Sequence, residues 1–256
     1  MNIGLIGEGA IGRHVQAELA KRGLVPVAWI VRPAKAQAGG PRVASARDLP
    51  EHVTLMIDCA GHAALAEHGP AILARGIDLL TVSPGALADP VLCDRLEQAA
   101  TAGGSRLYLA SGAIGALDCL QAARIGELAQ VRYTGRKPPR GWMGSPAETV
   151  LDLATLDQAA THFTGTAREA ALRYPKNANV AAAVALAGIG FDRTEVALIA
   201  DPAVTANVHE ITASGTFGRF TFHIEAASLP DNPKSSAIAA MSVVAAIERQ
   251  RGWISL

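Results

Sequence analysis

A glycine-rich loop near the start of the chain has the spacing of a dinucleotide-binding site. Residues 7–12 read "GEGAIG"; they follow a short apolar run and precede a helical pattern. In this spacing the first glycine allows a tight turn, the second lets the backbone approach a pyrophosphate, and the third lets a helix pack closely on a strand. The alternative is a glycine-rich turn that binds nothing. We expect NAD or NADP here, bound by Gly7, Gly9, Ala10, Ile11 and Gly12.

Arg32 bears on the choice between these two cofactors. It ends the second apolar run, where an acidic residue would bind the ribose 2′-hydroxyl of NAD. An arginine at this place accepts the 2′-phosphate of NADP, and the alternative is a solvated surface arginine. We therefore expect NADP to be accepted.

Small residues follow the later apolar runs, at the strand ends where ligands of parallel sheets gather. They occur in "DCAGH" (58–62), "SPGA" (83–86) and "SGAIGA" (111–116). Their size lets a nicotinamide and a ribose approach the backbone. In the first of these segments we expect Cys59 and Ala60 to contact the cofactor.

His209 is the candidate for chemistry in the second half of the chain. The sequence around it alternates with period two about a turn at Gly215–Gly218, which indicates a β-hairpin. That turn places His209 opposite Ile224, as the only ionisable group on an apolar face. The alternative is a core histidine with a backbone hydrogen-bond partner, but His209 follows a loop, where sites concentrate. The predicted face consists of His209, Ile211, Ala213, Phe220, Phe222 and Ile224.

The composition limits the partners of the chain. Its 23 basic and 23 acidic residues form no basic stripe, so we expect no binding to nucleic acid or to an anionic membrane surface. The longest apolar run is shorter than the ~20 residues of a membrane span. The three cysteines and the histidines lack the spacing of a disulfide framework or a zinc site, so we expect no metal. With no basic segment before the first apolar run, we expect a cytoplasmic protein.

The order of apolar runs and helical patterns predicts an α/β fold. Residues 1–115 alternate uniformly apolar strands with helices, which indicates a Rossmann-type doubly wound parallel sheet. Residues 116–230 are expected to form a second α+β domain with a mixed, partly antiparallel sheet, which binds the substrate. A last helix is expected within "KSSAIAAMSVVAAIERQ", beginning after "DNP". Residues 231–256, which contain this helix, are expected to pack back on the first domain.

Seven segments spread over nearly the full length carry a family resemblance. They are "GEGAIG" (7–12), "SGAIGALD" (111–118), "GRKPPRGW" (135–142), "PKNANVAAAVALAGIGFDRT" (175–194), "ADPAVTANVHEI" (200–211), "GTFG" (215–218) and "NPKSS" (232–236). Many dehydrogenases share the first. The segments "KNANVAA" and "N-x-H-E-I", in this order after "GAIG-x-x-D", are much more specific. On these motifs the chain resembles the L-aspartate dehydrogenase family.

The resemblance implies an enzyme that oxidises L-aspartate to iminoaspartate with NAD or NADP. The imine hydrolyses to oxaloacetate and ammonia, or feeds quinolinate and NAD synthesis. The resemblance also implies that the domain of residues 116–230 builds the interface of a homodimer. It further implies that Ala113 and Asn179 contact the cofactor and that His209 is the active-site histidine. Since water must attack the iminium carbon, and histidine has a pKa near ~6.5, His209 is suited to activating that water.

A dicarboxylate amino acid as substrate requires cations, and the chain has only five lysines. We expect Lys137, Asn177 and Lys234 to bind it, with Lys176, Arg136 and Arg140 as further options. Each cation has the alternative of a solvated surface charge, and Asn177 has the alternative of a helix cap. Lys234 is expected at the start of the last helix, where an anion is favoured.

Two other functions are open at this point. One is a related two-domain reductase of another acidic substrate, such as a dihydrodipicolinate-type imine or a homoserine-type alcohol. The other is a dinucleotide sensor that binds NAD(P) without turnover. No DNA-binding helix or basic patch in the sequence supports a sensor that acts on DNA.

Overall fold

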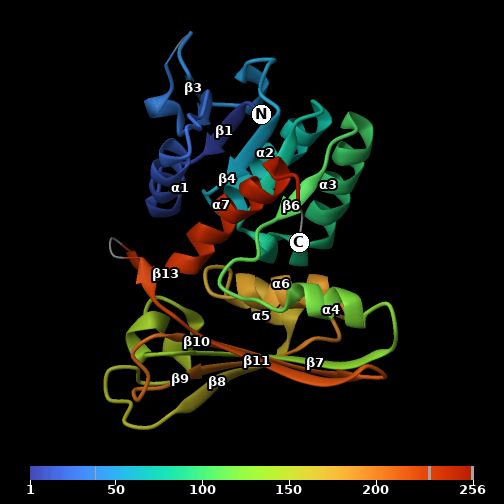
Figure 1. Cartoon of the computed structure of the whole chain (residues 1–256). Helices are drawn as coiled ribbons and strands as arrows, with labels where there is room; N and C mark the ends of the chain where they lie inside the picture. Colours follow the sequence, from blue (N-terminus) through green and yellow to red (C-terminus); the bar gives the residue numbers. More distant parts are fainter. Residues whose placement is uncertain (38, 230–231, 255–256) are drawn as a thin grey trace. The chain divides into compact units, whose positions relative to one another are not determined.

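The chain divides into two compact units in its computed structural model (Figure 1). The model describes the backbone of residues 1–37, 39–229 and 232–254, and the side chains of residues 1–37, 39–227 and 236–254. The first unit consists of Met1–Ala110 with Ala240–Leu256, and the second of Ser111–Ala239. The boundaries expected from the sequence followed residues 115 and 230.

The first unit is built on a six-stranded sheet in the order β3-β2-β1-β4-β5-β6. All neighbouring strands are parallel. β1 and β4 are buried at every residue, which explains why they read as continuous apolar runs. The strands are β1 (Ile3–Ile6), β2 (Ala28–Ile30), β3 (Arg42–Val43), β4 (Leu55–Asp58), β5 (Asp78–Thr81) and β6 (Leu107–Leu109).

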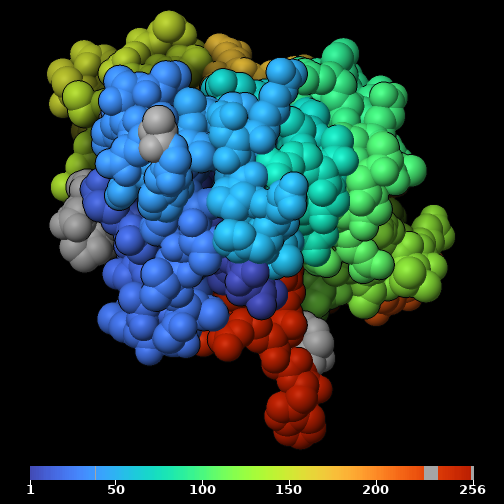
Figure 2. Space-filling model, turned by 90° about the horizontal axis from the view of Figure 1, so that it is seen from above, coloured from blue at the N-terminus to red at the C-terminus, as the bar shows by residue number. Residues whose placement is uncertain are grey.

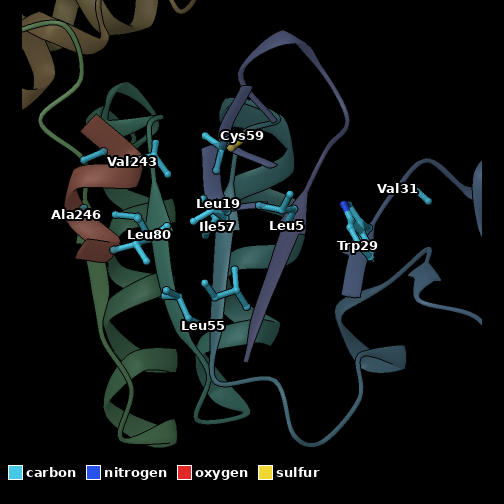
Figure 3. Close-up of a cluster of buried hydrophobic side chains, with 14 residues drawn as sticks. Leu5, Leu19, Trp29, Val31, Leu55, Ile57, Cys59, Leu80, Val243 and Ala246 are labelled. Atoms are coloured by element: carbon cyan, nitrogen blue, oxygen red, sulfur yellow. The ribbon is translucent and has the colours of Figure 1, made fainter. Parts of the chain in front are cut away.

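Helices cover both faces of this sheet, so the predicted doubly wound fold is confirmed. One face packs against α1 and α7, whose apolar side chains join those of the strands in one buried cluster. Figure 3 shows Val243 and Ala246 of α7 beside Leu80 of β5. α2 and α3 pack together near Leu79 of β5, where Gly69 approaches Leu96. The helices are α1 (Ala10–Lys21), α2 (His62–Ala74), α3 (Pro90–Gly103) and α7 (Ala237–Arg251).

The helix α7 returns the end of the chain to the first unit. Val243 and Ile247 are fully buried in the apolar cluster. An ion pair of 2.6 Å joins Arg22, the residue after α1, to Glu248, but its exposure limits what it contributes to stability. Figure 2 shows the red C-terminal part of the chain projecting from the surface. Trp253, which follows α7, is 94% exposed. The apolar face of α7, not this end, therefore holds the helix to the unit.

The second unit contains a mixed five-stranded sheet in the order β11-β10-β7-β9-β8. β7 and β9 are parallel, and the other pairs are antiparallel. The helices α4, α5 and α6 lie on one face of this sheet (Figure 1). This confirms the predicted second domain with a partly antiparallel sheet. The elements are α4 (Leu117–Ala123), β7 (Leu128–Lys137), β8 (Ala160–Thr166), α5 (Ala167–Arg173), α6 (Asn179–Ala187), β9 (Glu195–Ala200), β10 (Asn207–Gly215) and β11 (Gly218–Ala226).

The hairpin of β10 and β11 has the predicted register. Gly215 lies opposite Gly218, and His209 lies opposite Ile224. His209, Ile211 and Ala213 are buried, whereas the alternate residues of β11, from Arg219 to Glu225, are exposed. The hairpin therefore places His209 on the covered face of the sheet.

Two features of the second unit differ from the sequence expectations. The residues "NPKSS" do not begin the last helix; they form β13 (Asn232–Ser236), which pairs with β12 (Ser228–Leu229). The pairing with β12 extends to Ser236, which lies opposite Ser228, so α7 starts only at Ala237. β8 and α5 were also not predicted, because their sequences are short and weakly periodic. Pairing with β9 orders β8, and a capping box at Thr166 starts α5.

Candidate active site

Two glycines of the 7–12 loop are required by the packing of the first unit itself. Gly7 has a φ of +88°, which L side chains rarely adopt, and a Cβ there would lie 2.8 Å from the Cβ of Ala60. A Cβ on Gly12 would lie 2.6 Å from the carbonyl oxygen of Gly7. These two positions need glycine to bring α1 close to the strands.

At position 9, in contrast, no packing contact requires glycine. A Cβ added to it would meet nothing within 4 Å. Gly9 is the N-cap of α1, Ala10 is the first helical residue, and the first turn carries no acidic residue. The free N–H groups and the dipole of this helix end favour an anion. The open space above Gly9 therefore fits the pyrophosphate of a dinucleotide.

A cavity of about 510 Å³ opens beside this loop, within the size range of small-molecule sites. Five of the predicted cofactor residues line it: Gly7, Gly9, Arg32, Cys59 and Ala60. Burial, with a contribution from the Asp58 carboxylate, raises the pKa of the Cys59 thiol, which therefore acts as an apolar wall. The structure therefore brings Gly7, Gly9, Arg32 and the loop after β4 together around one cavity, whereas residues 83–86 are not part of its lining.

An ion-pair cluster at the edge of this cavity was not expected from the sequence. Glu8 accepts hydrogen bonds from Arg42 Nε at 2.9 Å and from Lys35 Nζ at 3.3 Å. The hydrogen bond from Arg42 is the main reason why the pKa of Glu8 is lowered. Lys35 lines the cavity together with the exposed Arg32. Glu8 thus pairs with two cations near the end of β2, and Arg32 is a further cation at the same cavity.

Asp58 orders two of the loops that follow the strands. Its fully buried carboxyl accepts hydrogen bonds from Thr81 Oγ1 at 2.7 Å and from the Ala60 amide at 2.9 Å. Thr81 Oγ1 in turn accepts one from the Ser83 amide at 2.9 Å. Burial raises the pKa of Asp58 against the effect of these hydrogen bonds. The small residues of both loops are therefore held in place by one carboxyl group.

His209 is buried in the second unit and has one hydrogen-bond partner among the described residues. Its Nδ1 lies 2.8 Å from the hydroxyl of Tyr133. Burial, with a smaller contribution from the charge of Lys137, lowers the pKa of His209 to about 3. The imidazole is therefore neutral at physiological pH.

Lys137 ends β7 and is also buried, with 8% of its surface exposed. Its Nζ donates a hydrogen bond of 3.0 Å to Asn177 Oδ1 and lies 4.9 Å from the centre of the Trp142 ring. Burial lowers the pKa of Lys137 to about 8. No carboxylate pairs with it in the described part of the chain, so an anion from outside can complete its environment.

An aromatic group lies beside Lys137. The His162 ring packs edge-on against Trp142, with ring centres 4.3 Å apart, and its Nδ1 lies 3.1 Å from the hydroxyl of Tyr174. Burial and the charges of Arg173 and Lys137 lower the pKa of His162 to about 4. Sequence reasoning missed this group because β8 was not recognised.

The remaining predicted residues take different places. Asn179 is the half-buried first residue of α6, and Ala113 is buried. Lys234 lies in β13, and its side chain is outside the described residues. Arg136 is bound by Asp201 at 2.5 Å, so its charge is already neutralised. Arg140 and Lys176 are exposed.

Searches for a metal site and a membrane span gave no candidate within the described ranges. No three His, Cys, Asp or Glu side chains lie close enough together there to hold a metal ion. No helix in that part of the chain has both the length and the apolar character needed to cross a bilayer.

The comparisons with known proteins agree with this arrangement. Residues 118–250 match the family model "Aspartate dehydrogenase, C-terminal", and residues 4–110 match "Homoserine dehydrogenase, NAD binding domain". The L-aspartate dehydrogenase of Ruegeria pomeroyi is 57% identical, over 98% of this chain and 93% of that protein. The chain belongs to the L-aspartate dehydrogenase family. The resemblance seen in the sequence motifs is therefore confirmed, as is the expectation of a domain that binds NAD or NADP.

Two further relatives extend this result. The L-aspartate dehydrogenase of Pseudomonas aeruginosa is 48% identical over the full length of both chains. The crystal structure of aspartate dehydrogenase from Thermotoga maritima superposes with a TM-score of 0.80 at 27% identity, covering 100% of this chain and 99% of that one. This member of the L-aspartate dehydrogenase family thus shares its fold over both units.

Proposed function

We propose that this chain catalyses the oxidative deamination of L-aspartate with NAD or NADP as the oxidant. The observation that carries the proposal is the buried cation Lys137 of the second unit, whose partners among the described residues are all neutral, in a chain whose first unit is an NAD-binding domain. A buried ammonium without a counter-ion is unfavourable alone and favours a carboxylate ligand.

The reaction balances in two steps. The bound nicotinamide supplies a hydride acceptor for the hydrogen on Cα of aspartate. Loss of that hydride and of one N–H proton converts the Cα–N bond into the C=N bond of iminoaspartate. Water then adds to the same carbon, and ammonia leaves, which gives oxaloacetate. The chain must therefore bind two carboxylates, hold Cα in place and provide polar groups at that carbon.

The residues are proposed to share these tasks as follows. Lys137 binds one substrate carboxylate, and Asn177, which already accepts from Lys137 Nζ, orients it. Lys234 is proposed as a second cation, and His209 as the catalytic residue at the reacting carbon. The proposed cofactor residues are Gly7, Gly9, Ala10, Ile11 and Gly12 for the pyrophosphate, Arg32 for a 2′-phosphate, and Cys59, Ala60, Ala113 and Asn179 for the nicotinamide end.

The direct test follows NAD(P)H absorbance with purified protein. L-Aspartate with each oxidised cofactor should give NAD(P)H, and oxaloacetate with ammonia should consume it. L-Glutamate, L-homoserine and a dihydrodipicolinate-type imine are the comparison substrates. Faster turnover of one of these would overturn aspartate as the substrate, and cofactor binding without any turnover would favour a sensor.

Two further expectations belong to the same proposal. We propose a homodimer, as the family resemblance implies, and light scattering after size exclusion should then give twice the 26.4 kDa of one chain. We also propose a cytoplasmic location, which the odd number of cysteines in the sequence, three, supports. Fractionation of cells that express the protein would test the location.

A further inference from the structure

The hydroxyl of Tyr133 and the imidazole of His209 form a buried pair that the sequence analysis did not anticipate. Tyr133 Oη lies 2.8 Å from His209 Nδ1. The two side chains are 1% and 3% exposed, and their rings are nearly parallel, 21° apart, with centres separated by 6.0 Å. The contact therefore fixes both the position and the plane of the imidazole.

The sheet register explains how the two groups meet. His209 of β10 lies directly opposite Gly135 of β7, whereas Tyr133 lies opposite Ile211. Tyr133 and His209 are thus diagonal neighbours on the covered face. A Cβ on Gly135 would lie 2.7 Å from Tyr133 Oη. The absence of a side chain at Gly135 therefore provides the space through which the hydroxyl reaches the ring.

The direction of this hydrogen bond follows from the partners available. Burial raises the pKa of Tyr133, so its hydroxyl keeps its hydrogen, and His209 Nδ1 is its hydrogen-bond partner within the described residues. If Nδ1 were the donor, the buried hydroxyl hydrogen would lack an acceptor, at a cost of about 1–3 kcal/mol. The hydroxyl therefore donates to Nδ1. A neutral imidazole has one N–H, so its hydrogen must be on Nε2.

We propose that Tyr133 is a positioning residue that holds His209 as the Nε2–H tautomer, so that His209 donates a hydrogen bond to an oxygen of bound aspartate instead of taking a proton from water. The proposal rests on the proposed function for the identity of the substrate, but the tautomer belongs to the protein alone. It replaces the water-activating role expected from the sequence. A neutral N–H donor beside the Lys137 ammonium suits a dicarboxylate, because neither group repels it.

The tautomer can be measured without any turnover. In protein labelled with ¹⁵N-histidine, the imidazole shifts of His209, assigned by their loss in His209→Gln, report which nitrogen carries the hydrogen. We expect hydrogen on Nε2 at neutral pH. Hydrogen on Nδ1 would overturn the proposal, whatever the enzyme assay shows. Failure of the wild type to oxidise aspartate, with hydrogen on Nε2, would instead reject the proposed substrate.

Two variants should disturb the tautomer, and a third should not. Tyr133→Phe removes the hydroxyl, and Gly135→Ala displaces it; both should shift His209 Nδ1 and Nε2 towards a mixture of tautomers. Tyr174→Phe is the matched control, because it removes a hydroxyl bonded to another buried histidine, His162. If Tyr174→Phe alters the His209 signals as strongly as Tyr133→Phe, the effect is general repacking and the positioning role is wrong.

A substitution series separates a donor from a base. The side-chain amide of His209→Gln donates a hydrogen bond but takes up no proton, whereas His209→Leu does neither. A hydrogen bond to a charged group contributes about 1.5–3 kcal/mol, so kcat/KM for aspartate should be about 10-fold or more higher in His209→Gln than in His209→Leu. Equal loss in the two variants would show that His209 acts as a base.

The dependence of kcat/KM on pH distinguishes a positioning role of Tyr133 from a purely structural one, which would leave the shape of the profile unchanged. Donation by Tyr133 stabilises the neutral imidazole, so its loss should raise the pKa of His209 and move the acidic limb of kcat/KM to higher pH in Tyr133→Phe. A profile that keeps its shape while only its height falls would contradict the proposal.

Discussion

Lys137 Nζ donates a 3.0 Å hydrogen bond to Asn177 Oδ1, and this amide is the hydrogen-bond acceptor of a buried ammonium. Within the described part of the chain, the other partner of Nζ is the Trp142 ring, whose centre lies 4.9 Å away. Both partners are neutral, so the desolvation of the charge is only partly offset. In a protein that binds a dicarboxylate, this imbalance is expected, because the ligand supplies the missing anion.

The first prediction concerns substrate binding. Lys137→Met should raise KM for aspartate about 10-fold or more, since a hydrogen bond to a charged group contributes about 1.5–3 kcal/mol. The Kd of the cofactor should stay within about twofold of the wild type. Lys21→Met is the control, because Lys21 is exposed on α1 and the net charge changes equally. An unchanged KM in Lys137→Met would exclude Lys137 from the substrate site.

Lys137→Met should weaken substrate binding, but it should make the folded state more stable. Replacing a buried charge that lacks a counter-ion by an apolar side chain should raise the free energy of unfolding at neutral pH. The pKa of Lys137 is about 8 in the native state. In the unfolded chain the pKa of this lysine is about 10.4. Between pH values of about 8 and about 10.4 the native state has therefore lost a proton that the unfolded chain still holds, so the wild type should gain stability as the pH rises through this window. Urea unfolding at several pH values would show this gain in the wild type and its absence in Lys137→Met.

The second prediction compares two glycines of the cofactor loop. Gly9→Ala places a Cβ in open space, so it should cost less than about 1 kcal/mol of stability, yet it should raise the Kd of NAD at least about 10-fold. Gly12→Ala places a Cβ 2.6 Å from a backbone oxygen and should lower the free energy of unfolding by about 1–3 kcal/mol. Calorimetric titration and urea unfolding measure the two effects. Equal loss of stability in both variants would show that Gly9 serves packing instead of the ligand.

The third prediction concerns cofactor choice. Arg32→Ala should lower kcat/KM for NADP about 10-fold while changing the value for NAD by less than about threefold, because only NADP presents a 2′-phosphate. Arg47→Ala is the matched control, since Arg47 is exposed and does not line the cavity. If Arg32→Ala affects both cofactors equally, the 2′-phosphate contact is wrong, and Lys35 becomes the next residue to test.

The features that were predicted correctly from the sequence are those set by residues close together in the chain. Gly7 and Gly12 have a backbone reason to be glycine, and the period-two pattern of residues 207–226 was sufficient to place His209 opposite Ile224. These features depend on neighbours in sequence or on one short turn. Their prediction therefore needed no knowledge of how distant elements pair.

The features that the sequence did not predict depend on distant partners. The contact of Tyr133 with His209 requires the pairing of β7 with β10, and the contact of His162 with Trp142 requires that β8 lie beside the segment that follows β7. The pairing of Glu8 with Arg42 likewise joins residues 34 positions apart. Only the fold supplies such pairings. The isolated charges and histidines in the sequence gave no sign of them.

The last prediction concerns stability in acid. The pKa of His209 is lowered to about 3 and that of His162 to about 4. Between these values and about 6.5, the unfolded chain binds protons that the native state does not, so the free energy of unfolding should fall as the pH drops below about 6.5. At about pH 5 each histidine should account for about 2 kcal/mol of this loss.

The pH dependence of the free energy of unfolding should therefore be shallower in His162→Gln and in His209→Gln. His52→Gln, at an exposed histidine, should keep the wild-type slope. Equal slopes in all four proteins would show that these two imidazoles accept protons in the folded state.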